Sequence, residues 1–459
     1  MKSLFTSLMR VWKSEDIRRK LLITFALLAL YRVAANVPAP GVDRAILAQF
    51  LAGSTAGGNF LGFLDLLSGG TVSRFSLLSM GVYPYITAQI ILQLLIPIIP
   101  ALQKRMEEDP REGRRWMEKW TYYLAVPMAA LSAIGQINIF NALSLQALQQ
   151  EILPFGFTGD KLLPSLTVLL AMTAGTMFAI WLGELISEFG IRGQGLSLVI
   201  FAGIVSQMPR NLGSLLADQA TFWFMLVFTL IVIVFTVFAI VYVQQGRRNV
   251  PVMYPGRRMG GSRMSMPVKG TLPLMVNLAG MIPLIFASAI LQFPAIASGF
   301  FISSTNEGVK AFAQGVQSFF ATGTSNWGYW IIYFFMVVIF TFFYTSVLFD
   351  QQNYGENLKR SGASVPGVHV GAPTQKYLSR VQRRITLPGA LFLGLVAIMP
   401  FLLSLLLKVF GVATSGAAAG LFLVSSSGLL IVVGVVRDTF MNIDAELKLH
   451  GYQDSLLVR

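Results

Sequence analysis

The chain lacks cysteine altogether and has only two histidines, His369 and His450. These absences exclude disulfides, thiolate chemistry and cysteine-ligated metals, and they disfavour a usual histidine-based metal site. The sequence also has no GxxxxGK[ST] phosphate-binding loop, no Ser-His-Asp arrangement and no pair of catalytic carboxylates. We therefore expect no enzyme activity and no cofactor, and any energy source for this protein must come from a partner.

Charge is scarce as well. Charged residues make up 12% of the 459 positions and hydrophobic residues 54%, whereas soluble domains carry about 25% charge. Long apolar runs recur along the chain, which excludes an ordinary cytosolic enzyme and a disordered chain and predicts an all-α polytopic membrane protein. The expected spans are 21–38, 74–100, 117–141, 162–184, 193–210, 219–245, 271–294, 327–349, 385–408 and 415–437.

The distribution of basic residues supports ten spans. The range 193–210 is weak alone because it contains four polar side chains, but parity and charge both require it. With both termini in the cytoplasm, 28 of the 35 lysines and arginines lie in cytoplasmic segments and 6 on the opposite side. This asymmetry follows the positive-inside rule, and removing one span would scramble it.

The spans divide into two groups of five. Halves with an equal odd number of spans have opposite topology, as in inverted repeats, although no residue-level repeat between them is evident. We expect a cytoplasmic amphipathic N-terminus (1–20), an N-terminal half (21–210), a C-terminal half (211–437) and a cytoplasmic tail (438–459). The basic loops 246–270 and 350–384 are either solvated topology determinants or docking sites for an anionic partner such as a ribosome or an acidic protein.

Residues 57–73 fit no span. Their helical part, 59–67, would be only about 14 Å long, contains Asp65 and is flanked by glycines. It is either an interfacial helix on the extracytoplasmic side or a segment in the mouth of a cavity, because non-helical backbone at membrane depth must line water or protein.

Two spans carry unusual polar groups and prolines. Pro84 is expected to kink the second span, which also contains Thr87, and Pro283 lies within the seventh span after Asn277. Such polar groups are either interhelical contacts worth about 1 kcal/mol or breakable contacts of a gate. The midplanes of the spans are nearly free of charge, which argues against the alternative of a secondary transporter for a small solute with inverted repeats. A further alternative, an intramembrane enzyme, requires a catalytic dyad that is not evident.

Five stretches carry a resemblance to a known family. They are LDLLSGGTVSRFSLLSMGVYPYITAQIILQLL (64–95), TMFAIWLGELISEFGIRGQGLSLVIFAGI (176–204), LPLMVNLAGMIPLIFASAIL (272–291), YLSRVQRRITLPGALFLGLVAIMP (377–400) and GLLIVVGVVRDT (428–439). In order and content they resemble SecY, the channel subunit of the bacterial Sec protein translocase. The resemblance implies a clamshell of ten transmembrane helices in two inverted halves around an hourglass pore. It also implies a bacterial cytoplasmic (inner) membrane location.

The resemblance further implies a passive channel for unfolded secretory polypeptides and membrane segments. Its pore ring would consist of Val82, Ile86, Leu196, Ile200, Ile285 and Ile431. A plug at about 59–70 would close the funnel with Asn59, Phe60, Leu61, Phe63, Leu64, Asp65, Leu66 and Leu67. A lateral gate between the second and seventh spans would release segments into membrane lipid and would include Thr87, Ser132 and Asn277.

The implied partners are the SecA ATPase, the ribosome, the small subunits SecE and SecG, signal sequences and nascent chains. Motor and ribosome docking would use Arg247, Arg248, Arg257, Arg258, Arg263, His369, Lys376, Arg380, Arg383 and Arg384. His369 departs from the family, in which an arginine occupies this position of the loop. An imidazole is only partly charged near neutral pH and lacks the guanidinium fork, so coupling to the motor or ribosome is expected to differ in this chain.

Overall fold

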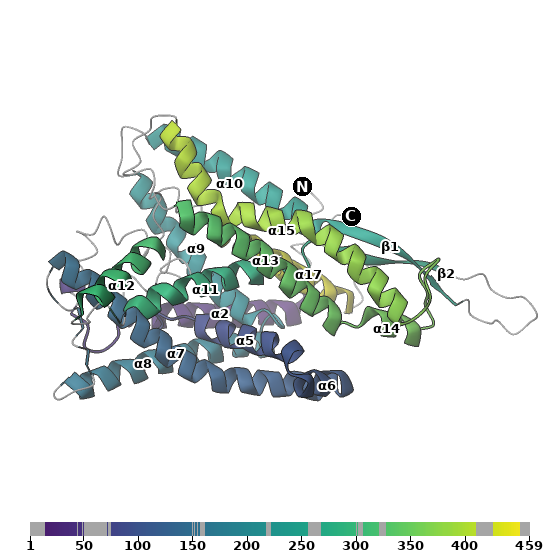
Figure 1. The fold of residues 1–459 in the computed structure, drawn as a ribbon, viewed down its shortest axis with the longest axis horizontal. Coiled ribbons are helices and arrows are strands. Elements are labelled where there is room, and N and C mark those ends of the chain that lie inside the picture. Colours follow the sequence, from purple (N-terminus) through teal and green to yellow (C-terminus); the bar gives the residue numbers. More distant parts are fainter. Residues whose placement is uncertain are drawn as a thin grey trace, which may run out of the picture.

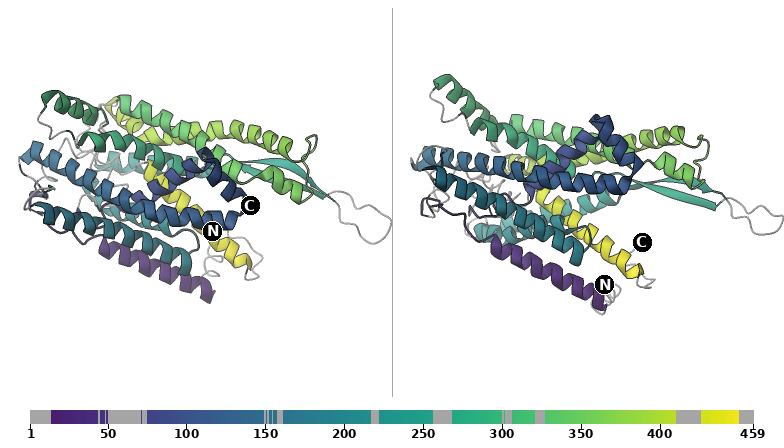
Figure 2. Two further views of the ribbon diagram at one scale, coloured as in Figure 1. Left: turned by 60° about the horizontal axis from the view of Figure 1, so that its bottom comes forward. Right: turned by 90° about the horizontal axis from the view of Figure 1, so that it is seen from below.

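The computed structural model describes residues 14–43, 45–47, 49, 71, 75–148, 150, 152–153, 155–156, 161–216, 222–255, 268–299, 301, 306–320, 327–409 and 426–449. Figure 1 shows long helices that lie side by side, with a two-stranded hairpin projecting from one end of the assembly. The views in Figure 2 place the N-terminal helix and the C-terminal helix on neighbouring parts of the molecule. Expected features at 1–13, 44, 48, 50–70, 72–74, 217–221, 256–267, 410–425 and 450–459 lie outside the described residues.

The helices account for most of the described chain. They are α2 (Glu15–Ala34), α5 (Tyr83–Ile98), α6 (Pro100–Glu108), α7 (Pro110–Leu148), α8 (Leu162–Phe189), α9 (Gly195–Leu216), α10 (Phe222–Gln245), α11 (Ile282–Gly299), α12 (Glu307–Phe320), α13 (Trp327–Gln351), α14 (Tyr354–Arg360), α15 (Ala372–Val409) and α17 (Ser426–Leu449). A helix overlaps each of the ten expected spans. The domain boundaries expected after residues 20, 210 and 437 fall inside α2, α9 and α17.

Fewer helices than expected meet the requirements of a membrane span by length and composition. In the described part of the chain four do so: Leu162–Phe189, Leu226–Gln245, Trp327–Arg360 and Ala372–Leu406. A fifth is added if Tyr83–Ile96 and Pro100–Met106, which are bent by 95°, form one broken span. The structure therefore shows a mostly helical protein with several apolar helices, and the ten-span arrangement stays a prediction.

Two expected spans, 74–100 and 271–294, become helical later than the sequence indicated. The first does so at Tyr83, where α5 begins. The range 271–294 opens as strand β2 (Val268–Met275), and its helix starts only at Ile282. Pro84 and Pro283 are the second residues of α5 and α11, so the expected kink at Pro84 was wrong, and Pro283 lies at the start of its helix although it falls in the middle of the expected span 271–294. Proline is favourable there because the first amides of a helix have no intrahelical acceptor.

The two basic loops fold into one unit with a core of its own. Strand β1 (Arg247–Tyr254) pairs antiparallel with β2, and Val250 and Val252 face the interior. These valines pack with Leu274, Phe349 and Leu358. The backbone groups of Met253 and Ser364 exchange two hydrogen bonds of 2.8 and 2.9 Å. The described parts of the two loops thus form a folded platform; their expected roles, as topology determinants or as docking sites, stay predictions.

The helices bury two large apolar cores and leave apolar side chains outside. One core is built mainly from α10, α11, α13, α15 and α17, and the other mainly from α2, α5, α8 and α9. Large apolar side chains remain exposed along the outer faces, among them Phe25 (74%), Leu163 (76%) and Phe238 (69%). A surface of this kind is stable only in contact with lipid or another apolar partner.

Candidate functional site

Six aliphatic side chains, one from the residue before α5 and five from four helices, belong to or pack against one hydrophobic cluster. Val82 directly precedes α5, and Val82, Ile285 and Ile431 are 4%, 6% and 1% exposed. Ile86, Leu196 and Ile200 pack against the same cluster and are partly buried. We call these six residues the aliphatic collar. They are the six that sequence analysis selected for the pore ring; all six lie in or against this one large cluster, and the ring itself stays a prediction.

The start of α5 and the start of α11 follow the same local pattern. Gly81 and Gly280 have φ angles of 54° and 65°, a left-handed conformation that glycine adopts without strain. Each glycine is followed three residues later by the proline of the first helical turn and five residues later by Ile86 or Ile285. The pattern G-x-x-P-x-I-x-A-x-x-I-L-Q covers 81–93 and 280–292. The two halves thus contain a residue-level repeat that sequence analysis alone missed.

The expected polar gate residues bond within their own segments. Thr87 Oγ1 donates to the Tyr83 carbonyl at 3.0 Å, within α5. Asn277 lies in the turn before α11, is 5% exposed, and donates from Nδ2 to the Gly280 carbonyl at 3.1 Å. Asn277 Oδ1 is buried without a hydrogen-bond partner among the described residues. In that part of the chain neither bond crosses from α5 to α11, although the two helices are in contact.

Helix α7 lies beside the two helices of the expected gate. Ser132 is half-buried on α7, which contacts both α5 and α11. One turn further along α7, Gln136 is 5% exposed and accepts a 3.2 Å hydrogen bond from Ser79 Oγ, just before α5. Sequence analysis did not select Gln136. The expected third span contains three amide side chains, Gln136, Asn138 and Asn141, and amides among apolar residues were the signal that could have pointed to it.

The folded platform carries most of the described cationic candidates on its surface. Arg247, Arg248, Lys376, Arg380 and Arg384 are exposed. His369 is also exposed, in the loop before α15, where its carbonyl accepts a 2.7 Å bond from Thr374 Oγ1. Arg257, Arg258 and Arg263 lie outside the described residues, as do all of the expected plug residues.

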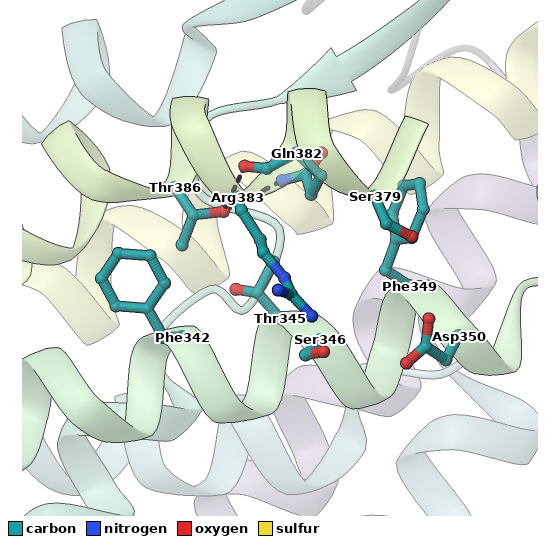
Figure 3. A pocket seen from close by; sticks show the side chains of 9 residues that line it. All are labelled: Phe342, Thr345, Ser346, Phe349, Asp350, Ser379, Gln382, Arg383 and Thr386. Carbon is teal, nitrogen blue, oxygen red and sulfur yellow. Dashed lines mark hydrogen bonds between the residues drawn. The ribbon is translucent and has the colours of Figure 1, made fainter. Parts of the chain in front are cut away.

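Arg383 is exposed as well, but it differs from the other cationic candidates because it also lines a pocket. It points from α15 toward α13 and lines a small cavity of about 30 Å³ between them (Figure 3). Asp350 and the buried groups Thr345 Oγ1 and Gln382 Oε1 line the same cavity. Gln382 also ties α15 to β2, because its Nε2 donates to the Met275 carbonyl at 3.0 Å. Arg383 thus belongs to the joint between the platform and the apolar helices.

The described part of the chain shows no cluster of three or more His, Asp or Glu side chains suited to a metal. The chemistry that the site offers is apolar packing at the collar, a few buried polar groups beside it, and cationic groups on the platform.

Comparison with known proteins identifies relatives along the whole chain. A family model described as SecY matches residues 76–440. The protein translocase subunit SecY of Streptomyces griseus is 36% identical over 460 residues, covering 99% of this chain and 100% of the relative.

Two solved structures share the fold at 18% sequence identity, and each comparison covers 96% of this chain and 95% of the other. One is described as a protein-conducting channel and has a TM-score of 0.60. The other, with a TM-score of 0.58, is described as showing that the SecY plug domain stabilises the closed state of the translocation channel and maintains a membrane seal.

Proposed function

This chain belongs to the SecY family of protein translocase subunits, and we propose that it is the channel through which a translocase passes unfolded polypeptides across the bacterial cytoplasmic membrane. In this proposal ten helices form two inverted halves around an hourglass pore, and both termini are cytoplasmic. The helices that overlap all ten expected spans and the repeat at 81–93 and 280–292 support that arrangement.

The convergence of the aliphatic collar carries the proposal. Six aliphatic side chains, from the residue before α5 and from α5, α9, α11 and α17, fall in or against one cluster. An apolar constriction resists hydrated ions because it dewets, and it has no charge to hold a passing chain. The same feature argues against the secondary transporter, which would require an ion-coordinating group at this depth.

The lateral gate would open between α5 and α11. Thr87 and Asn277 each bond within their own segment, so separating the two helices breaks neither hydrogen bond. The unpartnered Asn277 Oδ1 favours movement, because a buried acceptor gains a hydrogen bond when water or an entering polypeptide reaches it. Ser132 on α7 would line the same path. The segment 59–70 would act as the plug and leave the funnel when the gate opens.

The cytoplasmic platform would receive the driving partner. SecA or a translating ribosome would dock on its exposed cations and on the loop of His369, while SecE and SecG would bind the channel within the membrane. Because the two basic loops share one core, a force on one is transmitted to the other.

A crosslink across the gate tests the proposal. The chain has no native cysteine, so Thr87→Cys with Asn277→Cys provides the only thiols. We expect joining the two thiols with a short, reducible bifunctional crosslinker to block translocation of a presecretory substrate, and reduction to restore it. Each single variant, treated identically, is the control. Full secretion with the crosslink in place would contradict a gate between α5 and α11.

A further inference from the structure

An amphipathic helix lies at the end of the molecule away from the β1–β2 hairpin. Helix α12 follows α11 and precedes α13, and it contacts both (Figure 1). Its charged residues, Glu307 and Lys310, lie on one side of the helix together with polar residues such as Gln314, and Val309, Phe312 and Phe319 share another side. We propose that α12 is a membrane-interface helix whose outer apolar edge inserts among phospholipid acyl chains beside the gate helix α11.

The apolar side of α12 is wider than its contact with the protein. Ala313 is 2% exposed, and Phe320 packs against the core that contains Leu291 and Tyr329. Phe312, in contrast, is 74% exposed and Phe319 is 41% exposed. One edge of the apolar side therefore holds the helix on the protein, and the other edge faces outward.

The outward edge continues an apolar surface that already requires lipid. Phe319 lies against the first turn of α13, where a Cβ built on Gly328 would come within 2.9 Å of its ring. From that turn an exposed stripe runs along α13 through Trp327 (58%), Ile331 (52%) and Phe335 (57%). Aromatic side chains at the end of a span are typical of the membrane–water boundary. Continuity with this stripe is the reason for choosing lipid as the occupant.

The charges of α12 define the kind of membrane contact. The opposite charges of Glu307 and Lys310 cancel, so the helix has no basic face for anionic headgroups. Insertion must then depend on apolar area alone. We expect α12 to insert to the same depth in zwitterionic and in anionic vesicles, in contrast to helices that bind acidic lipid through lysines.

Single-cysteine labelling tests the proposal in the full chain, because no native cysteine interferes. An environment-sensitive fluorophore is attached to Phe312→Cys, and the protein is reconstituted in phosphatidylcholine vesicles with nitroxide lipids. We expect nitroxide near the headgroup to quench this probe at least about threefold more strongly than the same probe on Gln314→Cys, the matched polar-side control. Aqueous iodide should quench the probe on Gln314→Cys more strongly than the probe on Phe312→Cys.

A third position separates this inference from the proposed function on which it rests. The same probe on Phe335→Cys reports whether α13 spans the membrane. If nitroxide lipids quench the probe at position 335, and the probes at 312 and 314 respond alike to lipid and to iodide, α12 is not a membrane-interface helix. If the probe at 335 is unaffected by lipid, both the span and the inference are wrong. Quenching at 312 that requires anionic lipid would also contradict insertion through apolar area alone.

Discussion

Ile86 and Ile285 occupy equivalent positions in the two halves of the protein. Each is the fourth residue of its helix and lies five residues after a glycine with positive φ. Ile285 belongs to the hydrophobic cluster that contains the collar residues, and Ile86 packs against that cluster. The shared start of α5 and α11 thus delivers one isoleucine from each half to the same cluster.

Asparagine at either position should loosen the closed channel. An amide in the packed collar lacks a hydrogen-bond partner at a cost of about 1–3 kcal/mol, and it is hydrated when the channel opens. We expect Ile86→Asn or Ile285→Asn to raise export of a substrate with a defective signal sequence by about tenfold. Ile339, on α13, is 58% exposed. Ile339→Asn is the control and should change the export of this substrate little. If the variants reject the defective signal sequence as strictly as the unmodified protein does, the assignment of these residues to a pore ring is wrong.

Gly175 should tolerate no side chain. A Cβ there would lie 2.1 Å from the Leu77 carbonyl oxygen, where α8 crosses the segment before α5. We expect Gly175→Ala to lower the free energy of unfolding by about 1–3 kcal/mol, measured as a lower Tm in detergent. Gly315→Ala is the matched control, because its Cβ meets no atom within 4 Å. It should leave the Tm equal or slightly higher. Equal losses in both variants would show that the close approach does not matter.

Lys20 on α2 forms an ion pair with Glu446 on α17, and Ile17 packs beside it against Ile443. The pair joins the first described helix to the last. We expect Lys20→Glu to reduce stability by about 1 kcal/mol, because it places two carboxylates together. Adding Glu446→Lys should recover most of the loss. Thermal unfolding of the unmodified protein, the Lys20→Glu variant and the double variant measures this. A double variant no more stable than Lys20→Glu alone would exclude a direct interaction.

His369→Arg should strengthen motor docking. Arginine is fully charged and offers a rigid fork to carboxylates, whereas histidine is only partly charged near neutral pH. We expect SecA to bind the variant in membrane vesicles several-fold more tightly at low salt, with the gain shrinking as ionic strength rises. Gln351→Arg adds the same charge at another exposed site of the 350–384 loop. An equal gain from Gln351→Arg would mean that net charge, not the His369 position, governs binding.

The sequence alone indicated an apolar, multi-helical membrane protein. Hydropathy is a sum over single residues, and the bias of lysine and arginine is also additive, so neither requires knowledge of contacts. The collar residues came from matched motifs, because an aliphatic side chain in a channel has no local feature that separates it from one in a lipid-facing position.

The tertiary structure decided the features that depend on contacts between distant segments. Residues 271–275 open an expected span, yet they form part of strand β2 because Arg247–Tyr254 pairs with them and the loop before α15 covers the pair. Arg383 is one cation among several in the sequence, and only the packing of α15 on α13 places it in the lining of the same cavity as Asp350. Pairing and packing energies are gained between segments remote in sequence, so no local pattern encodes them.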